Sequence, residues 1–291
     1  MSYEKLVELF DKLNKNIPED NLKMSLTETI SVWEGIYGLN KNKKIPADLD
    51  IDLDNLIHFY IVEYASFAVC VDDKSNMRET LLYSGLFTTI TNTVFTIWKL
   101  AIDGLDYSAK VLLRNLLELM LILITVLLDS EKRNALMDAT ENDTTKEVWH
   151  KHFRSDKMIA VISKYLKAVE NPLKKWVKEQ YTHFSSYVHN DFLALLGFSR
   201  AVTDKEKEIT HLNICGNYAT RTNHLLDEVA ELCYVFDLMF VFIYREKIKD
   251  KTDTTFSGFL TEEESWKKAM CLSEINKICY EEIISKKNNK K

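Results

Sequence analysis

The sequence predicts an all-α fold, a multi-helix bundle with two strongly buried central helices. Its 291 residues include 7 glycines and 3 prolines, where average usage gives about 20 and about 15. Both residues are costly inside helices and are needed at the turns of β proteins. Apolar residues at helical spacing along most of the chain are a second, independent observation. A β-sandwich or a doubly wound α/β fold is therefore excluded.

The apolar spacing predicts the elements in chain order. Helices are expected over residues 2–16, 26–37, 53–71, 76–102, 106–128, 146–154, 155–169, 172–189 and 222–247, before a last one that begins near residue 261. The first has one apolar face and ends before Pro18, and the second ends at Gly38. Polar connections are expected at residues 138–145, 203–210 and 250–258.

Two helix starts carry recognisable polar residues. Acidic residues alternate with apolar ones over 48–54, as in a calcium-binding loop, but the turn glycine is missing and the twelfth position is Phe59 rather than glutamate. These carboxylates are therefore expected to cap the helix over residues 53–71. Thr261 and Glu264 form a predicted capping box for the last helix.

Two segments, residues 106–128 and 222–247, are apolar enough to be enclosed by other helices. A membrane span needs about 20 largely apolar residues, and a charge at its centre costs roughly 2.5–3.5 kcal/mol. The first segment carries Arg114 and Glu118 in its middle, and the second carries Asp237. Buried core helices, with no membrane span, are therefore expected.

Three regions are expected along the chain. Residues 1–75 form an N-terminal helical segment that packs on the core, and residues 76–249 form the helical core domain. Residues 250–291 contain a linker, the C-terminal helix and a lysine-rich tail that is expected to fray.

Charge and cysteine content narrow the class of protein. A formal net charge of −6 argues against a general nucleic-acid coat. The cysteines are odd in number and form no Cys-x-x-Cys pair: Cys70, Cys215, Cys233, Cys271 and Cys279. Zinc ribbons and a disulfide framework are therefore disfavoured, and a reducing, cytoplasmic compartment is expected.

No cofactor and no metal are expected. The glycine-rich dinucleotide and phosphate loops and the zinc and di-iron helix motifs are absent from the sequence. His150 and His152 look like a metal pair, but side chains two residues apart on a helix face different sides.

Arg114 and Glu118 lie four residues apart on the most apolar predicted helix, so they share one face. Buried charges need partners, and removing one member of a buried pair costs about 3–5 kcal/mol. Asp237 and His189 are the candidates to complete the set. Two hypotheses stay open: a polar clamp that fixes the packing of three helices, or a catalytic or ligand-binding pocket.

The run over residues 181–191 has the highest density of side chains that could carry chemistry. His189 beside Arg114 would form a sensible acid–base pair, because the guanidinium could stabilise a phosphate during cleavage. A serine hydrolase is disfavoured because no Gly-x-Ser-x-Gly turn is present. The candidate catalytic residues are Arg114, Glu118 and His189, and the candidate ligand-binding residues are Tyr181, Ser185, Tyr187 and Asp237.

Taken in order, these features resemble an uncharacterised family of bacterial helical proteins. Its pattern is an apolar helix with Arg-x-x-x-Glu, a Trp-containing helix, and then Tyr-x-x-x-Ser-x-x-x-His. The matching residues in this chain are Arg114, Glu118, Trp149, Tyr181, Ser185 and His189, within roughly residues 80–245.

The helical layout of that family is similar to the HEPN superfamily, the nucleotide-binding and ribonuclease domains of bacterial toxin and phage-defence systems. Those ribonucleases carry a histidine five to seven residues after an arginine, and no arginine of this chain has one. Arg114 and His189 could substitute only if folding brings them together.

Three functions are consistent with these residues. The first is a non-catalytic or regulatory helical module of a bacterial defence or stress system that binds a protein partner or dimerises. The second is a metal-independent ribonuclease that uses His189 and Arg114 on RNA. The third is a small-ligand-binding protein in which Arg114 receives a carboxylate or phosphate. An Arg114 enclosed by Glu118 and Asp237 would favour the first function.

Overall fold

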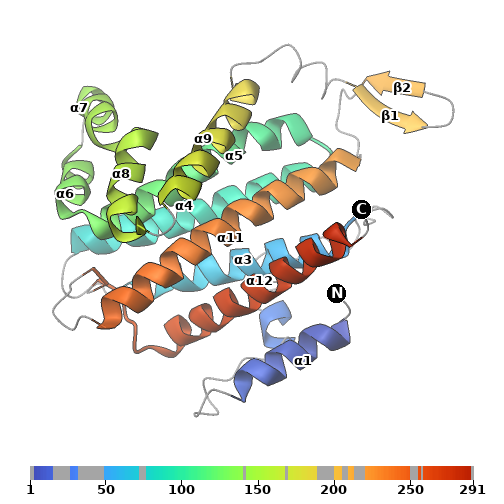
Figure 1. Cartoon of the computed structure of the whole chain (residues 1–291), viewed down its shortest axis with the longest axis horizontal. Helices are drawn as coiled ribbons and strands as arrows, with labels where there is room; N and C mark the ends of the chain where they lie inside the picture. The colour runs from blue at the N-terminus through green and yellow to red at the C-terminus, as the bar shows by residue number, and fades with distance from the viewer. Residues whose placement is uncertain are drawn as a thin grey trace.

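Long helices running side by side dominate the structure (Figure 1). The computed structural model describes residues 3–15, 27–31, 49–71, 77–139, 142–167, 170–188, 200–204, 209–212, 220–249, 255–256 and 258–289. The helices are α1 (Tyr3–Asn14), α3 (Ile51–Val69), α4 (Met77–Ile102), α5 (Asp106–Leu128), α6 (Ser130–Asp138), α7 (Asn142–Val148), α8 (Ser155–Tyr165), α9 (Glu170–Val188), α11 (Thr220–Lys249) and α12 (Glu264–Asn288). The predicted all-α bundle is confirmed, with the addition of one small β-hairpin.

Helix α3 starts at an acidic cap and runs through the middle of the bundle. The Asp50 carboxylate accepts a hydrogen bond from the backbone N–H of Leu53 at 3.3 Å. The predicted capping role of the acidic run is therefore confirmed at Asp50. Helices α4, α11 and α12 all pack against α3, which buries it on several sides.

The two predicted central helices are α5 and α11. Gly104, with φ at 75°, makes the turn that leads from α4 into α5. Helix α5 contacts α4, α8, α9 and α11, and α11 contacts α3, α4, α5 and α12. By length and composition α5 could cross a membrane, and 67% of its most apolar stretch is buried against the rest of the protein.

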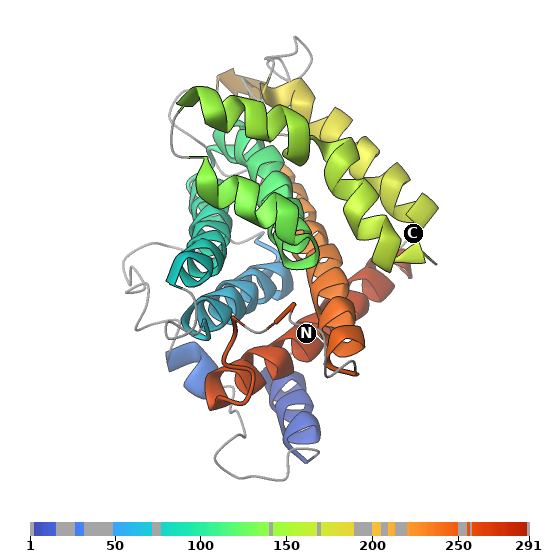
Figure 2. The ribbon, with the colours of Figure 1, turned by 90° about the vertical axis from the view of Figure 1, so that its left-hand side faces the viewer.

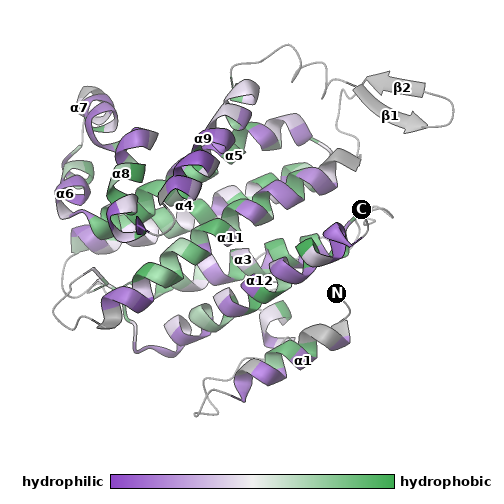
Figure 3. Cartoon of the chain, viewed as in Figure 1, coloured by the Kyte–Doolittle hydropathy of each residue, from purple (hydrophilic) through white to green (hydrophobic). Residues whose placement is uncertain are grey.

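The helices form layers. Helices α6 to α9 lie on the side of the bundle opposite to α1 and α12, with α3, α4, α5 and α11 between them (Figures 1 and 2). Apolar residues are concentrated where the long helices face each other, and polar residues cover α6, α7 and the outer side of α9 (Figure 3).

An aromatic cluster joins the ends of α3, α11 and α12. The buried ring of Trp266 lies 4.9 Å from that of Phe67 and 6.1 Å from that of Phe240, between ring centroids. Phe256 and Phe259 complete the cluster at 6.2 and 5.3 Å from Trp266. Phe256 lies within the expected linker over residues 250–258, so part of that linker belongs to the core.

The three expected regions do not correspond to separate hydrophobic cores. Buried residues of α3 and α12 belong to one continuous core with those of α4, α5, α8, α9 and α11. Helix α3, expected in an N-terminal segment, and α12, expected after a linker, therefore help to form the central packing.

Local differences from the predicted elements have identifiable causes. Helix α6 was not predicted because it buries no residue and shows no apolar stripe. Its start is stabilised by the Asp129 carboxylate, which accepts a hydrogen bond from the backbone N–H of Lys132 at 3.1 Å. The expected helix over residues 146–154 is divided into the end of α7 and a π-helical turn at Trp149–Phe153.

Two further differences lie nearer the C-terminus. The expected connection over residues 203–210 is an antiparallel hairpin of β1 (Arg200–Asp204) and β2 (Ile209–Leu212), whose β-branched residues favour strands. The predicted capping box of the last helix is wrong, because Glu263 occupies the cap position of α12 and makes no side-chain cap bond.

Replacing Trp266 by alanine is expected to lower the free energy of unfolding by about 3–5 kcal/mol, because the change removes a buried indole that packs on three elements. Urea denaturation followed by circular dichroism measures the loss. The matched control is Leu81→Ala on α4, where the leucine is 61% exposed, and its effect should stay within about 0.5 kcal/mol. Equal effects of the two changes would contradict this account of the core.

Candidate functional site

Helices α5 and α9 face each other across a row of polar side chains. The Arg114 Nε lies 3.1 Å from Glu118 Oε1, and the guanidinium lies 5.6 Å from the centre of the Tyr181 ring. Glu118 also lies close enough to Tyr181 to affect its pKa. Burial raises the pKa of Tyr181 and the charge of Glu118 raises it further, so the phenol stays protonated and can donate. Three predicted site residues are thus in contact.

One turn earlier on α5, Lys110 makes a second and more buried cluster. Its Nζ lies 2.8 Å from Glu228 Oε1 on α11 and 3.4 Å from the Tyr187 hydroxyl on α9. The Nε2 of His183 lies 3.1 Å from the same Glu228 oxygen. Tyr187 was a predicted site residue, whereas Lys110 and Glu228 were not.

Burial and the neighbouring cationic and hydrogen-bonding groups shift the pKa of Glu228 in opposite directions. Burial by itself raises the pKa of Glu228. The hydrogen bond from His183 and the charge and hydrogen bond of Lys110 outweigh burial, so the pKa is lowered and the carboxylate stays ionised. The ammonium and the carboxylate therefore neutralise each other inside the bundle.

Further hydrogen bonds extend the same row and tie α5, α9 and α11 together. The Tyr107 hydroxyl donates to the backbone carbonyl of Tyr187 at 2.8 Å. The Thr222 hydroxyl donates to Asp106 at 3.1 Å, and Trp176 Nε1 donates to Glu231 at 2.7 Å. We name Lys110, Arg114, Glu118, Tyr181, His183, Tyr187 and Glu228 the α5–α9 polar row.

Asp237 does not complete the Arg114 set, which corrects that expectation. Its Oδ1 accepts a hydrogen bond from the Tyr64 hydroxyl of α3 at 3.0 Å. The reason is helical geometry: Asp237 comes nine residues, or two and a half turns, after Glu228 and so lies on the opposite side of α11. One side of α11 therefore serves the polar row and the other side faces α3 and α12.

The remaining predicted residues lie as follows. Ser185 is half-buried on α9, one turn after Tyr181 and on the same face. His189 lies outside the described residues, which end at Val188 in this part of the chain. His152 is buried whereas His150 is exposed, so the two histidines face different sides as expected. Within the described ranges, no three His, Cys, Asp or Glu side chains could hold a metal ion together.

A second polar group lies between α3, α11 and α12. Glu63 is fully buried and Asp237 is 5% exposed, and the two carboxyl groups lie close enough for the charge of Asp237 to raise the pKa of Glu63. The Asn276 amide donates to Glu63 Oε2 at 2.7 Å. Burial raises the pKa of both carboxyls well above their usual range, and the hydrogen bonds that oppose the rise do not offset it.

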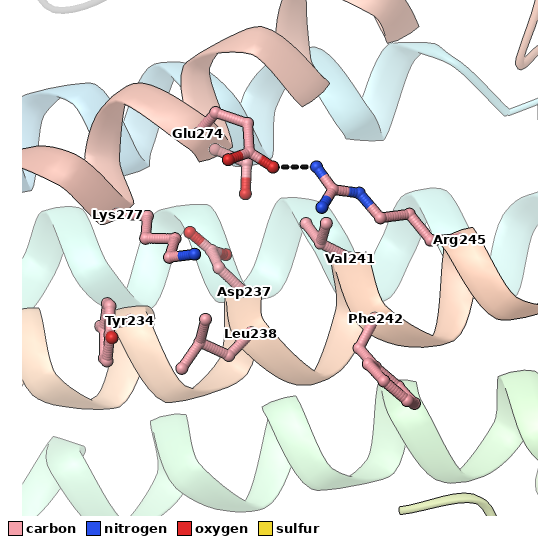
Figure 4. A pocket seen from close by; sticks show the side chains of 9 residues that line it. Tyr234, Asp237, Leu238, Val241, Phe242, Arg245, Glu274 and Lys277 are labelled. Carbon is pink, nitrogen blue, oxygen red and sulfur yellow. Dashed lines mark hydrogen bonds and ion pairs between the residues drawn. The ribbon is translucent and has the colours of Figure 1, made fainter.

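Asp237 also lines a pocket of about 190 Å³ between α11 and α12. Asp237, Val241 and Arg245 project from α11 toward α12, and Leu238 and Phe242 lie further round the same helix (Figure 4). An ion pair between Arg245 and Glu274 crosses one end of the pocket (Figure 4). The pocket is therefore lined by the carboxyl group of Asp237, by apolar side chains and by charged residues at its rim.

Comparison of the chain with protein-family models, with curated proteins and with solved structures found no match.

Replacing Glu228 by glutamine is expected to destabilise the protein by about 3 kcal/mol, the low end of the range for breaking a buried pair. The change leaves the Lys110 ammonium, whose side chain is 8% exposed, beside a neutral amide. Glu118→Gln is the matched control: its cationic partner Arg114 is 29% exposed, against 8% for Lys110, so water screens the charge that remains and the loss should stay below about 1 kcal/mol. Urea denaturation near neutral pH measures both, and the reverse order would contradict the assigned roles.

Proposed function

We propose that this chain is a non-catalytic helical module that acts as a homodimer, joined through the face formed by α11 and α12. The observation that carries the proposal is an exposed aromatic side chain beside a pocket of matching size. Phe242 exposes 48% of its surface at the edge of the pocket of about 190 Å³. A cavity of about 150 Å³ holds a benzene molecule, so this pocket is large enough for one phenyl ring.

Two-fold symmetry makes such a patch self-complementary. In an isologous dimer the same surface of each subunit meets its copy, so Phe242 of each copy would enter the pocket of the other. Leu238, one turn away and 39% exposed, adds apolar surface to the centre of the contact. Arg245, Glu274 and Lys277 supply a rim with charges of both signs, as interfaces with an apolar centre usually have.

The α5–α9 polar row supports the non-catalytic part of the proposal. A group that binds or cleaves a phosphate needs a cation that can meet the ligand. The Arg114 guanidinium is paired with Glu118, and the Lys110 ammonium is paired with Glu228, both within 3.1 Å. These charges join three helices, which is the role of a polar clamp. The setting in a bacterial defence or stress system rests on the sequence resemblance.

Light scattering coupled to gel filtration is expected to give twice the monomer mass for the wild-type chain and the monomer mass for Phe242→Asp. The aspartate would have to be buried without a partner in the other subunit, which is costly. Leu81→Asp on α4 is the matched control, because Leu81 is also exposed and lies on another helix, and this variant should stay dimeric.

Two results would contradict the dimer. One is a wild-type chain that remains monomeric at its highest soluble concentration. The other is a loss of dimer in Leu81→Asp equal to that in Phe242→Asp, which would show a general effect of added charge. Circular dichroism of each variant checks that the fold is retained.

RNA cleavage tests the non-catalytic assignment separately. Purified wild-type protein without added metal is expected to leave RNA intact, and so are Arg114→Ala and the control Arg78→Ala. Arg78 is an exposed arginine that pairs with Asp138 on the surface. Cleavage by the wild type and by Arg78→Ala, but not by a folded Arg114→Ala, would overturn the assignment and support the ribonuclease alternative.

A further inference from the structure

The carboxyl groups of Glu63 and Asp237 each have one satisfied and one unsatisfied oxygen. Glu63 Oε2 accepts from Asn276 at 2.7 Å, and Asp237 Oδ1 accepts from Tyr64 at 3.0 Å. Glu63 Oε1 and Asp237 Oδ2 are buried, and no described residue donates a hydrogen bond to them. Ionised carboxylates only accept hydrogen bonds, so the two groups cannot satisfy each other while both are charged.

We propose that Glu63 and Asp237 share one proton, which links Glu63 Oε1 to Asp237 Oδ2 and makes the pair a proton-binding site where α3, α11 and α12 meet. A single proton satisfies both orphaned oxygens at once, because it turns one of two acceptors into a donor. It also removes one of two adjacent negative charges from the interior. The proposal does not require the dimer, because Glu63 is fully buried inside each subunit. Asp237 also lines the pocket of the proposed dimer face.

The side chains that act on Glu63 and Asp237 carry no positive charge, so a bound proton is what compensates the negative charge of the pair. The groups that act on the two carboxyls or titrate beside them are Tyr60 and Tyr64 of α3, Cys233 of α11, and Ser273, Asn276 and Tyr280 of α12. All of these are neutral near pH 7. Arg245 and Lys277 line the same pocket as Asp237, but neither is among the groups that shift the pKa of Glu63 or Asp237, and Arg245 is paired with Glu274.

The site makes stability depend on pH with a definite sign. In the unfolded chain both carboxyls lose their protons above about pH 4.3. In the folded chain the pKa values of Glu63 and Asp237 are raised, so the shared proton is kept at higher pH. The folded state therefore binds more protons, and stability falls as pH rises from the unfolded pKa toward the folded one. One proton corresponds to up to about tenfold in the folding equilibrium constant per pH unit.

The test compares urea unfolding of the wild type and of Glu63→Gln between about pH 6 and about pH 9. The glutamine amide can donate to Asp237 and accept from Asn276, so it replaces the proton permanently. Relative to this variant, the wild-type folding constant should fall by up to about tenfold per pH unit. Glu179→Gln on the exposed side of α9 is the matched control and should follow the wild type.

Infrared spectroscopy gives a second measurement that needs no unfolding. A protonated carboxylic acid band is expected in the folded wild type near neutral pH, retained in Glu179→Gln and absent in Glu63→Gln. If Glu63→Gln does not fold, the band of the wild type and its disappearance at high pH still decide the matter. The same results are expected in the Phe242→Asp background, so failure of the dimer and failure of the proton site are distinguishable.

Two outcomes would overturn the proposal. Parallel pH profiles of the wild type and Glu63→Gln, without a carboxylic acid band, would mean that no proton is shared. Stabilisation of the wild type but not of the variant by calcium, magnesium or potassium at high pH would mean that a cation fills the site. Such a cation would be held by the unsatisfied oxygens of Glu63, Asp237, Asn276 and Tyr60.

Discussion

Charges carried by enclosed helices must be neutralised inside the bundle, and this constraint determines how the other helices are placed. Helix α5 is apolar along most of its length but carries Lys110, Arg114 and Glu118. Because a buried ammonium without a counter-charge is strongly unfavourable, α11 must bring Glu228 to within 2.8 Å of Lys110. Helix α9 covers the same row with the rings of Tyr181 and Tyr187. The polar row thus sets how α9 and α11 lie against α5.

Helix α11 serves two different polar environments because a helix repeats every 3.6 residues. Glu228 faces cations on α5 and α9 and stays ionised, since its pKa is lowered. Asp237, on the opposite side, faces another carboxyl and several neutral groups, and its pKa is raised. A carboxyl group on one side of α11 therefore stays ionised, whereas the carboxyl group on the other side favours its protonated form. The neighbouring groups differ, and Asp237 is also more deeply buried than Glu228.

Helix α11 packs on α3, α4, α5 and α12 and still exposes Leu238 and Phe242 at the surface. Helix α12 packs closely on α3 but leaves an open pocket against α11 near Asp237. The exposed Leu238 and Phe242 lie next to that pocket and form one apolar patch with it. The interior of the bundle thus holds the charges in fixed pairs, and its surface carries the apolar patch through which we propose that two copies associate.

The fold class and most long helices followed from the sequence because apolar periodicity is a local property. The bounds of α5 coincide with the predicted range, and those of α4 and α11 agree within two residues. Elements without an apolar stripe could not be predicted in this way, because α6 buries no residue and the hairpin lies in a polar segment. The contribution of Phe256 to the core also could not be predicted, because it depends on Trp266 of another element.

The sequence by itself determined that Arg114 and Glu118 share a face and that charges on α5 and α11 need partners, because spacing along one helix is local information. Only the tertiary structure decided which partners these are. Glu228 lies 118 residues from Lys110, and Asn276 lies 213 residues from Glu63. The rotation of each helix about its axis depends on the packing of all its neighbours. For that reason Asp237 meets Glu63 and Tyr64 rather than Arg114.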